Sequence, residues 1–204
     1  MKITDIKTFL MHVGAPDLKA WASDNAFGSQ EVSKGISGTR NWLFVKVYTD
    51  EGITGIGECS GWPRVIETAV KDLKNILIGE DPTHIERIWQ RMNSAIMVHG
   101  MTGTVGAGAM TGIDMALWDI KGKALGVPVW NLLGGKVRDR IRIYAHANTP
   151  EVALSLKARG VTAIKCGGVS DPVRKVAALR EAIGEEVDLM IDLHGPPWLT
   201  PGDA

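Results

Sequence analysis

The sequence lacks an excess of charge of either sign, because its 204 residues include 23 lysines and arginines and 23 aspartates and glutamates. A chain without net charge offers no electrostatic argument for binding nucleic acid or an anionic membrane. No apolar run is long enough to span a membrane, and the first residues carry charges where a secretory signal needs an apolar run. The two cysteines, Cys59 and Cys166, lie far apart without the spacing of a metal site. We therefore expect a cytoplasmic protein without disulfide bonds.

The first 130 residues are predicted to combine strands with helices. A strand is expected at 2–13, and strands at 41–49 and 53–59 around a short turn indicate a hairpin. Apolar residues at helical spacing predict helices at 63–78, from 81 onward and at 104–125. Residues 14–38 keep no period, and a loop of this length is usually a lid or a disordered segment.

Strands alternate with helices from residue 140 onward. Strands are predicted at 140–147, 161–166 and 186–195, with helices at 149–159 and 171–183 between them. This order and spacing are typical of βαβ units and a parallel sheet. Thr200-Pro201 predicts the start of a further helix, with Thr200 as the N-cap residue and proline at the first helical position. We therefore expect a fragment that holds the first part of an α/β barrel, a fold that needs about 250 residues by itself.

The last predicted strand has two different faces, because side chains alternate along a strand. One face carries Val187, Leu189, Ile191 and Leu193, and the other carries Asp188, Met190, Asp192 and His194. The apolar face is expected to pack under helices. On the other face, a carboxylate and an imidazole lie two residues apart at the carboxyl end of the strand, where barrel enzymes have their active sites. Two interpretations are open for Asp192: a ligand of a metal ion or polar cavity, or a cap for the following loop.

Several runs of residues together indicate a family. These are AMTGIDMALWDIKGK at 109–123, GVP at 126–128, LLGG at 132–135 and the hairpin VKVYTDEGITGIGEC at 45–59. They resemble the mandelate racemase and muconate-lactonising branch of the enolase superfamily. The resemblance implies an α+β capping domain at residues 1–130, followed at 131–204 by the first three strands of a (β/α) TIM-like barrel. It also implies a homo-oligomer for the full-length protein.

The chemistry shared by that family begins with removal of the proton next to a substrate carboxylate, and Mg²⁺ stabilises the charge that develops. The resemblance matches Asp192 to the first of three carboxylate ligands of the metal. It matches Lys165 to the first lysine of a K-x-K motif, which binds the substrate carboxylate and the developing charge; the alternative is a solvated lysine at a strand end. The second lysine of the motif falls at Gly167. This departure argues against a lysine base and a two-base racemase.

His194 resembles the histidine of the D-x-H-G pattern in acid-sugar dehydratases of the galactonate type, where it protonates the departing hydroxyl. Imidazole suits this role because its pKa lies near neutrality. The alternative is a histidine that supports the loop by hydrogen bonding.

Three further residues are candidates for substrate binding, each with a structural alternative. His146 and Asn148 lie at the end of the first barrel strand, and Trp198 lies in the loop after the last one.

The resemblance therefore predicts a Mg²⁺-dependent dehydratase acting on a small carboxylate substrate, a sugar acid. Racemisation, epimerisation or cycloisomerisation is the alternative reaction, and a non-catalytic truncated product is the alternative class.

Overall fold

The computed structural model describes residues 1–13, 40–61, 63–98, 100, 103–168 and 170–193. These residues divide into two units, the first ending at Val137 and the second beginning at Arg138. The first unit therefore includes residues 131–137, which the sequence analysis assigned to the second domain. Within the described ranges, no helix is long and apolar enough to cross a membrane.

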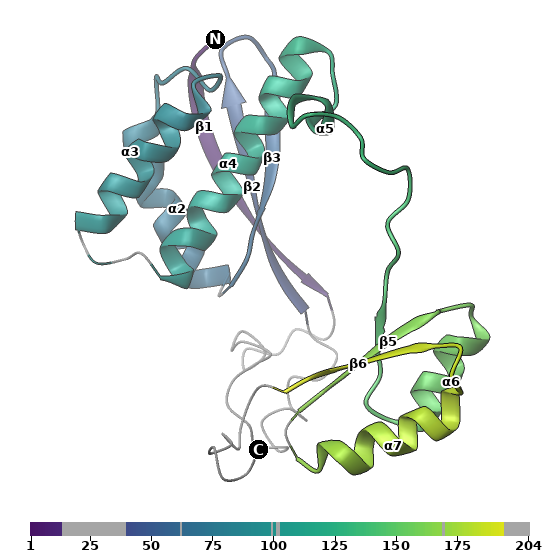
Figure 1. The fold of residues 1–204 in the computed structure, drawn as a ribbon. Coiled ribbons are helices and arrows are strands. Elements are labelled where there is room, and N and C mark those ends of the chain that lie inside the picture. Colours follow the sequence, from purple (N-terminus) through teal and green to yellow (C-terminus); the bar gives the residue numbers. More distant parts are fainter. Residues whose placement is uncertain (14–39, 62, 99, 101–102, 169, 194–204) are drawn as a thin grey trace. The chain divides into compact units, whose positions relative to one another are not determined.

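The first unit is an antiparallel sheet covered by helices (Figure 1). The sheet has the order β1 (Ile3–Val13), β2 (Arg40–Thr49) and β3 (Thr54–Cys59). The helices are α2 (Pro63–Leu77), α3 (Ile85–Val98), α4 (Thr104–Leu125) and the short α5 (Val129–Leu132). Alternate residues of β2 (Leu43, Val45 and Val47) are fully buried in the core that the sheet shares with α2, α3 and α4. This α+β arrangement is the one expected for residues 1–130.

The boundaries of the helices follow local chemistry. Helix α4 has the predicted bounds, and it ends where Gly126 adopts a left-handed conformation with φ of 70°. Helix α3 begins at Ile85, later than the predicted start at Asp81. The reason is that the Asp81 carboxylate accepts hydrogen bonds from both the backbone N–H and the hydroxyl of Thr83, at 2.9 and 2.8 Å. These bonds form a turn before the helix and not its first residues.

Helix α4 lies against β3 at backbone-to-backbone distance. A Cβ added to Gly57 would lie 1.9 Å from the carbonyl oxygen of Gly112, and one added to Gly55 would lie 1.9 Å from that of Ala116. A Cβ on Gly112 would meet the Cys59 Sγ at 2.2 Å. The glycines of the hairpin and of the helix are therefore required because the strand and the helix leave no room for a methyl group between them.

Two side chains of α4 bind the free edge of β3, and we call this pair the β3 edge clamp. The Asp119 carboxylate accepts a hydrogen bond from the backbone N–H of Ile56 at 2.9 Å. The Lys123 ammonium donates to the carbonyl oxygen of Thr54 at 2.8 Å and to the Asp119 carboxylate at 2.5 Å. The family-like run at 109–123 thus supplies both the close packing against β3 and the protection of its edge.

The second unit is a parallel sheet with the order β4, β5 and β6 (Figure 1). Its elements are β4 (Ala145–His146), α6 (Pro150–Ala158), β5 (Ala163–Gly167), α7 (Pro172–Ile183) and β6 (Asp188–Asp192). Both helices begin as predicted, because Thr149 and Asp171 cap them with side-chain hydrogen bonds and a proline follows each cap. This is the predicted strand–helix–strand–helix–strand order.

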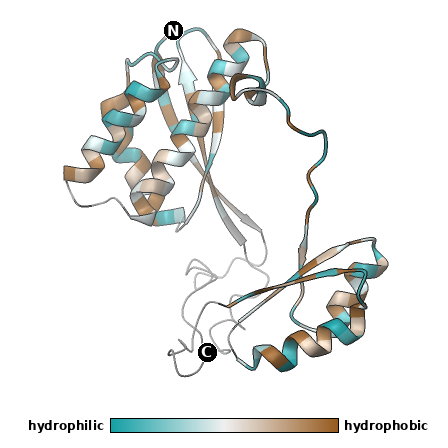
Figure 2. Cartoon of the chain, in the orientation of Figure 1, coloured by the Kyte–Doolittle hydropathy of each residue, from teal (hydrophilic) through white to brown (hydrophobic). Residues whose placement is uncertain are grey.

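The outer strands are shorter than predicted. The predictions were 140–147 and 186–195, whereas β4 and β6 have two and five residues; residues 194 and 195 lie outside the described part of the chain. The central strand sets the length of β6, since their ladder runs from Ala163, opposite Asp188, to Gly167, opposite Asp192. Strand β4 pairs with β5 only at Ala145 and His146. Residues 140–143 alternate between arginine and isoleucine (Figure 2), and Ile141 is 78% exposed.

The expectation that the whole apolar side of the last strand packs under helices is wrong in part. Val187 is buried and Leu189 packs against the core formed with α6 and α7, but Ile191 is 36% and Leu193 55% exposed. The physical reason is that β6 is an outer strand of the described sheet, with strand β5 on one side only. Within the described part of the chain, the apolar contacts of β6 therefore come from β5 and the helices over it.

Candidate functional site

Lys165 and Asp192 meet at the carboxyl ends of β5 and β6. The parallel register pairs Gly167 with Asp192 and Lys165 with Met190. Asp192 therefore lies two residues further toward the carboxyl ends of the strands than Lys165 does. The lysine side chain reaches forward, and its Nζ lies 2.5 Å from Oδ2 of Asp192. Both residues lie on the face opposite the helices, and the structure brings together the two residues that the sequence selected.

The two faces of β5 differ sharply in burial. Ile164 and Cys166 are fully buried on the helix side, whereas Lys165 is 28% exposed on the other side. The hydrogen bond with the Asp192 carboxylate raises the pKa of Lys165 above its ordinary value, against the opposing effect of desolvation. The lysine is therefore a cation held beside a carboxylate. A substrate carboxylate at this place would meet a positive charge whose position is already set.

His146 lies on the same face as this ion pair. It is the ladder partner of Lys165 on β4, and its side chain is exposed. Its Nε2 atom lies 3.4 Å from the place that a Cβ of residue 167 would occupy, a distance of ordinary contact. Residue 167 is the glycine that stands where the resemblance predicts a second lysine. The structure thus groups His146, Lys165 and Asp192 around Gly167.

Asn148 is found in a structural role. Its Oδ1 accepts a hydrogen bond from the backbone N–H of Gly167 at 2.9 Å. The Lys175 ammonium, from α7, donates to the carbonyl oxygen of the same glycine at 2.7 Å, and the next N–H, of Gly168, donates to the Asp192 carbonyl at 3.1 Å. The end of β5 is therefore held from three sides. Sequence reasoning missed Lys175, because nothing in the pattern of α7 separates it from a solvated lysine.

Comparison with known proteins decides the family. Residues 24–134 match the model of the mandelate racemase / muconate lactonizing enzyme N-terminal domain. The chain belongs to this family. The match begins after β1, covers β2 to α5 of the first unit and confirms that the expected capping domain is present. The parallel sheet that follows carries the Lys165–Asp192 pair.

Relatives and solved structures agree with this family. A D-galactonate dehydratase from Xanthomonas oryzae pv. oryzae is 43% identical, over 76% of this chain and 45% of the relative. The 3,6-anhydro-D-galactonate cycloisomerase from Zobellia galactanivorans has a TM-score of 0.75 and 32% identity, over 94% of this chain and 51% of that one. An enolase from Agrobacterium radiobacter with bound sodium and L-malate has a TM-score of 0.71 and 26% identity, over 94% and 48%. The chain spans about half the length of the curated relatives it matches.

The remaining residues expected in the family's active site are only partly placed. His194 and Trp198 lie outside the described residues. Asp192 offers a carboxylate oxygen, the ligand type that Mg²⁺ prefers. Across the part of the chain that the structure describes, no group of three or more His, Cys, Asp or Glu residues could hold a metal ion. Asp192 therefore fits as one ligand of a magnesium ion, and the described residues do not complete such a site.

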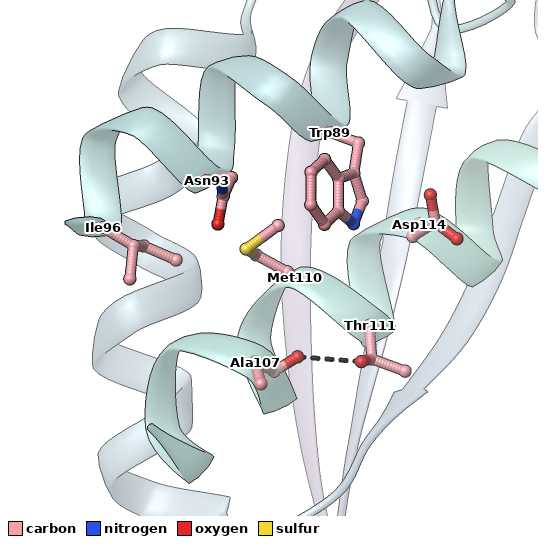
Figure 3. Close-up of a pocket in the computed structure, with 7 residues that line it drawn as sticks. All are labelled: Trp89, Asn93, Ile96, Ala107, Met110, Thr111 and Asp114. Atoms are coloured by element: carbon pink, nitrogen blue, oxygen red, sulfur yellow. Dashed lines mark hydrogen bonds between the residues drawn. The ribbon is translucent and has the colours of Figure 1, made fainter. Parts of the chain in front are cut away.

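A separate hollow of about 310 Å³ lies between α3 and α4 in the capping domain (Figure 3). It is lined by Trp89, Asn93, Ile96, Ala107, Met110, Thr111 and Asp114. The sequence analysis placed no site residue here. Trp89 is 42% exposed and lines the hollow. Burial and the charge of Glu86 raise the pKa of Asp114. The described residues that line the hollow include one carboxyl group, that of Asp114, and no lysine, arginine or histidine. The described lining therefore lacks a cationic side chain that could bind a substrate carboxylate.

Proposed function

We propose that the chain supplies part of the active site of a Mg²⁺-dependent dehydratase of sugar acids. The observation that supports this most strongly is the Lys165–Asp192 pair, 2.5 Å apart at the carboxyl ends of neighbouring parallel strands. The similarity to D-galactonate dehydratases supports the same reaction class. The activity, the substrate and the metal belong to the complete enzyme and are proposals for this chain. Its assembly as a homo-oligomer and its location in the cytoplasm also stay predictions.

The proposed reaction removes the proton next to the substrate carboxylate and then expels the hydroxyl on the neighbouring carbon as water. The enol that remains tautomerises to a 2-oxo-3-deoxy acid. When bound, Mg²⁺ supplies a positive charge beside the carboxylate oxygens, on which negative charge develops. Asp192 would hold the ion as one of its ligands. The Lys165 ammonium would bind the substrate carboxylate and stabilise the same developing charge.

In this proposal, His194 acts as the general acid that protonates the leaving hydroxyl. Trp198 is proposed to shape the pocket, and His146 to contact the substrate. Asn148 is better described as a residue that positions the end of β5, because its Oδ1 is occupied by the N–H of Gly167. The base that removes the proton is not among the residues proposed here.

A chimera tests the proposed function, since relatives are about twice as long as the matched region. It joins residues 1–204 of this chain to the part of the Xanthomonas oryzae enzyme that lies beyond that region. We expect the chimera to convert D-galactonate to the 2-oxo-3-deoxy acid when Mg²⁺ is present. Asp192→Asn should lower kcat/KM by about 10³-fold, the scale of one lost charge-stabilising group. His194→Asn should abolish dehydration while Mg²⁺ affinity is largely kept.

Asp188→Asn is the matched control. Asp188 lies on the same strand and the same face, but it pairs with Arg142 at the other end of β6. This variant should keep activity within about threefold, because exposed ion pairs contribute little to stability. Equal losses in the two aspartate variants would refute the assignment of Asp192. An epimer or a cyclic isomer as product would favour the second candidate reaction, which the cycloisomerase relative makes the alternative. A folded chimera that binds Mg²⁺ but forms no product would favour a non-catalytic chain.

A further inference from the structure

Gly167 has no local structural reason to be a glycine. Several glycines of the chain have a positive φ, including its neighbour Gly168 at 94°, but Gly167 is not among them. Among the described residues, a Cβ at Gly167 would touch only His146 Nε2 at 3.4 Å and the Asp192 carbonyl oxygen at 3.9 Å, both ordinary contacts. Neither the backbone nor the packing therefore excludes a side chain. The absence of a side chain leaves open space on the face that carries Lys165 and Asp192.

The border of this space is polar on both sides. On one side lies the Lys165 ammonium bound to Asp192. On the other side lies the His146 imidazole, and no described residue makes a hydrogen bond to it. The floor is rigid, because the N–H and the carbonyl of Gly167 are bound by Asn148 and Lys175. A ligand in this space would lie on the hydrogen-bonded backbone of Gly167, between the Lys165 ammonium and the His146 imidazole. Within the described residues, that imidazole has free hydrogen-bonding capacity.

We infer that Gly167 and His146 form a subsite for a hydroxyl group of the substrate. An imidazole can donate one hydrogen bond and accept another, which matches the two capacities of a hydroxyl. In the proposed reaction Lys165 binds the carboxylate and the β-hydroxyl is the leaving group that His194 protonates, so we assign to His146, the ladder partner of Lys165, a hydroxyl on the carbon chain beyond these groups. The subsite therefore selects acids with a hydroxyl-bearing chain beyond the reacting carbons over three-carbon acids. This inference rests on the proposed function and deepens it by naming a specificity residue.

The test compares two acids that carry the same reacting group but differ in length. D-Glycerate has only the α-hydrogen, the α-hydroxyl and the β-hydroxyl, whereas D-galactonate adds three further hydroxyl-bearing carbons. The dissociation constants of both acids are measured with Mg²⁺ by ligand-detected NMR on the chimera described above, in its His194→Asn form so that the acids are not consumed. His146→Phe removes the hydrogen bond at similar shape, and Gly167→Ala covers Nε2 with a methyl group while the imidazole stays in place.

Both variants should weaken D-galactonate binding about tenfold, the equivalent of one lost hydrogen bond, and should leave D-glycerate binding unchanged. His146→Gln, which keeps one donor and one acceptor, should lose less than His146→Phe. Met190→Leu is the control, because Met190 faces Lys165 from β6 without a polar group. It should change neither constant.

Two results would overturn the inference. An equal loss for both acids would mean that His146 serves the shared carboxylate end. No loss in the folded Gly167→Ala and His146→Phe variants would mean that the ligand does not reach the imidazole. The outcome is independent of the proposed reaction. A chimera that binds D-galactonate with the predicted pattern but, with His194 in place, does not dehydrate it would support the hydroxyl subsite and refute the proposed dehydratase reaction.

Discussion

Replacing Gly57 by alanine probes the closest contact in the capping domain. The added Cβ would lie 1.9 Å from the carbonyl oxygen of Gly112, 2.9 Å from its carbonyl carbon and 3.0 Å from the Met115 Cβ. A carbon and a carbonyl oxygen approach no closer than about 3.3 Å even in favourable contacts, so helix and strand must separate locally by roughly 1.4 Å. The nearest atoms are backbone on both sides, and no side-chain rotation can relieve the clash.

The free energy of this clash is large for a single methyl group. Overpacking of a core by a few atoms destabilises by about 1–3 kcal/mol, and a clash between two backbones belongs at the upper end. About 3 kcal/mol is a substantial fraction of the 5–15 kcal/mol that is typical for a domain. For a chain of this size the midpoint of thermal unfolding should fall by about 10 °C.

Thermal unfolding followed by circular dichroism measures this effect, with Gly103→Ser as the control. Gly103 is the N-cap of α4, and a Cβ there would meet no atom of the described residues within 4 Å. Serine is a preferred N-cap residue, so this variant should be as stable as the parent or slightly more stable. A Gly57→Ala protein that unfolds within 2 °C of the parent would refute the close approach of α4 to β3.

Three further variants or measurements test other features of the capping domain. Asp119→Ala opens the β3 edge clamp, and it should lower stability by about 1 kcal/mol and promote concentration-dependent association in analytical ultracentrifugation, whereas Lys121→Ala on the same helix should not promote association. Asp114 has a raised pKa, so its favourable contribution is present below its ordinary value of 3.8 and is lost as the pH rises through the folded-state pKa. Asp114→Asn should therefore be more stable than the parent above the folded-state pKa of Asp114 and not below pH 3.8, by less than about 1 kcal/mol because the group is part-exposed, as measured in pH-dependent thermal melts. Burial raises the pKa of the Cys59 thiol to about 11, so its reaction with a disulfide reagent at pH 8 should be at least 100-fold slower than that of an exposed cysteine; a rate near the exposed value would refute its burial.

The sequence predicted best those elements whose ends are set by local chemistry. Helices α6 and α7 begin where Thr149-Pro150 and Asp171-Pro172 place a cap and a proline, and these residues need no distant partner. Asp81 shows the limit of the same reasoning, because a cap-forming side chain can also close a separate turn before the helix.

Strand lengths could not be predicted in the same way. The extent of β4 and β6 depends on which residues of β5 lie opposite, and a single strand's sequence does not contain this information. The candidate site likewise has residues whose placement the sequence predicted and residues whose role it did not. The positions of Lys165 and Asp192 at strand ends were sufficient to bring them together, whereas an amide such as that of Asn148 can bind backbone or ligand equally well.

The β3 edge clamp has a consequence for how the capping domain tolerates change. Asp119 and Lys123 bind the backbone N–H of Ile56 and the carbonyl of Thr54, groups that every residue other than proline also possesses. These side chains bind the edge of β3 as a fourth strand would, through its backbone, and the bonds do not depend on which side chains β3 carries. The outward side of the strand, where Ile56 is 52% exposed, is thus free to vary in composition while the sheet keeps three strands. Proline at residue 56 is the one substitution that removes the bound N–H.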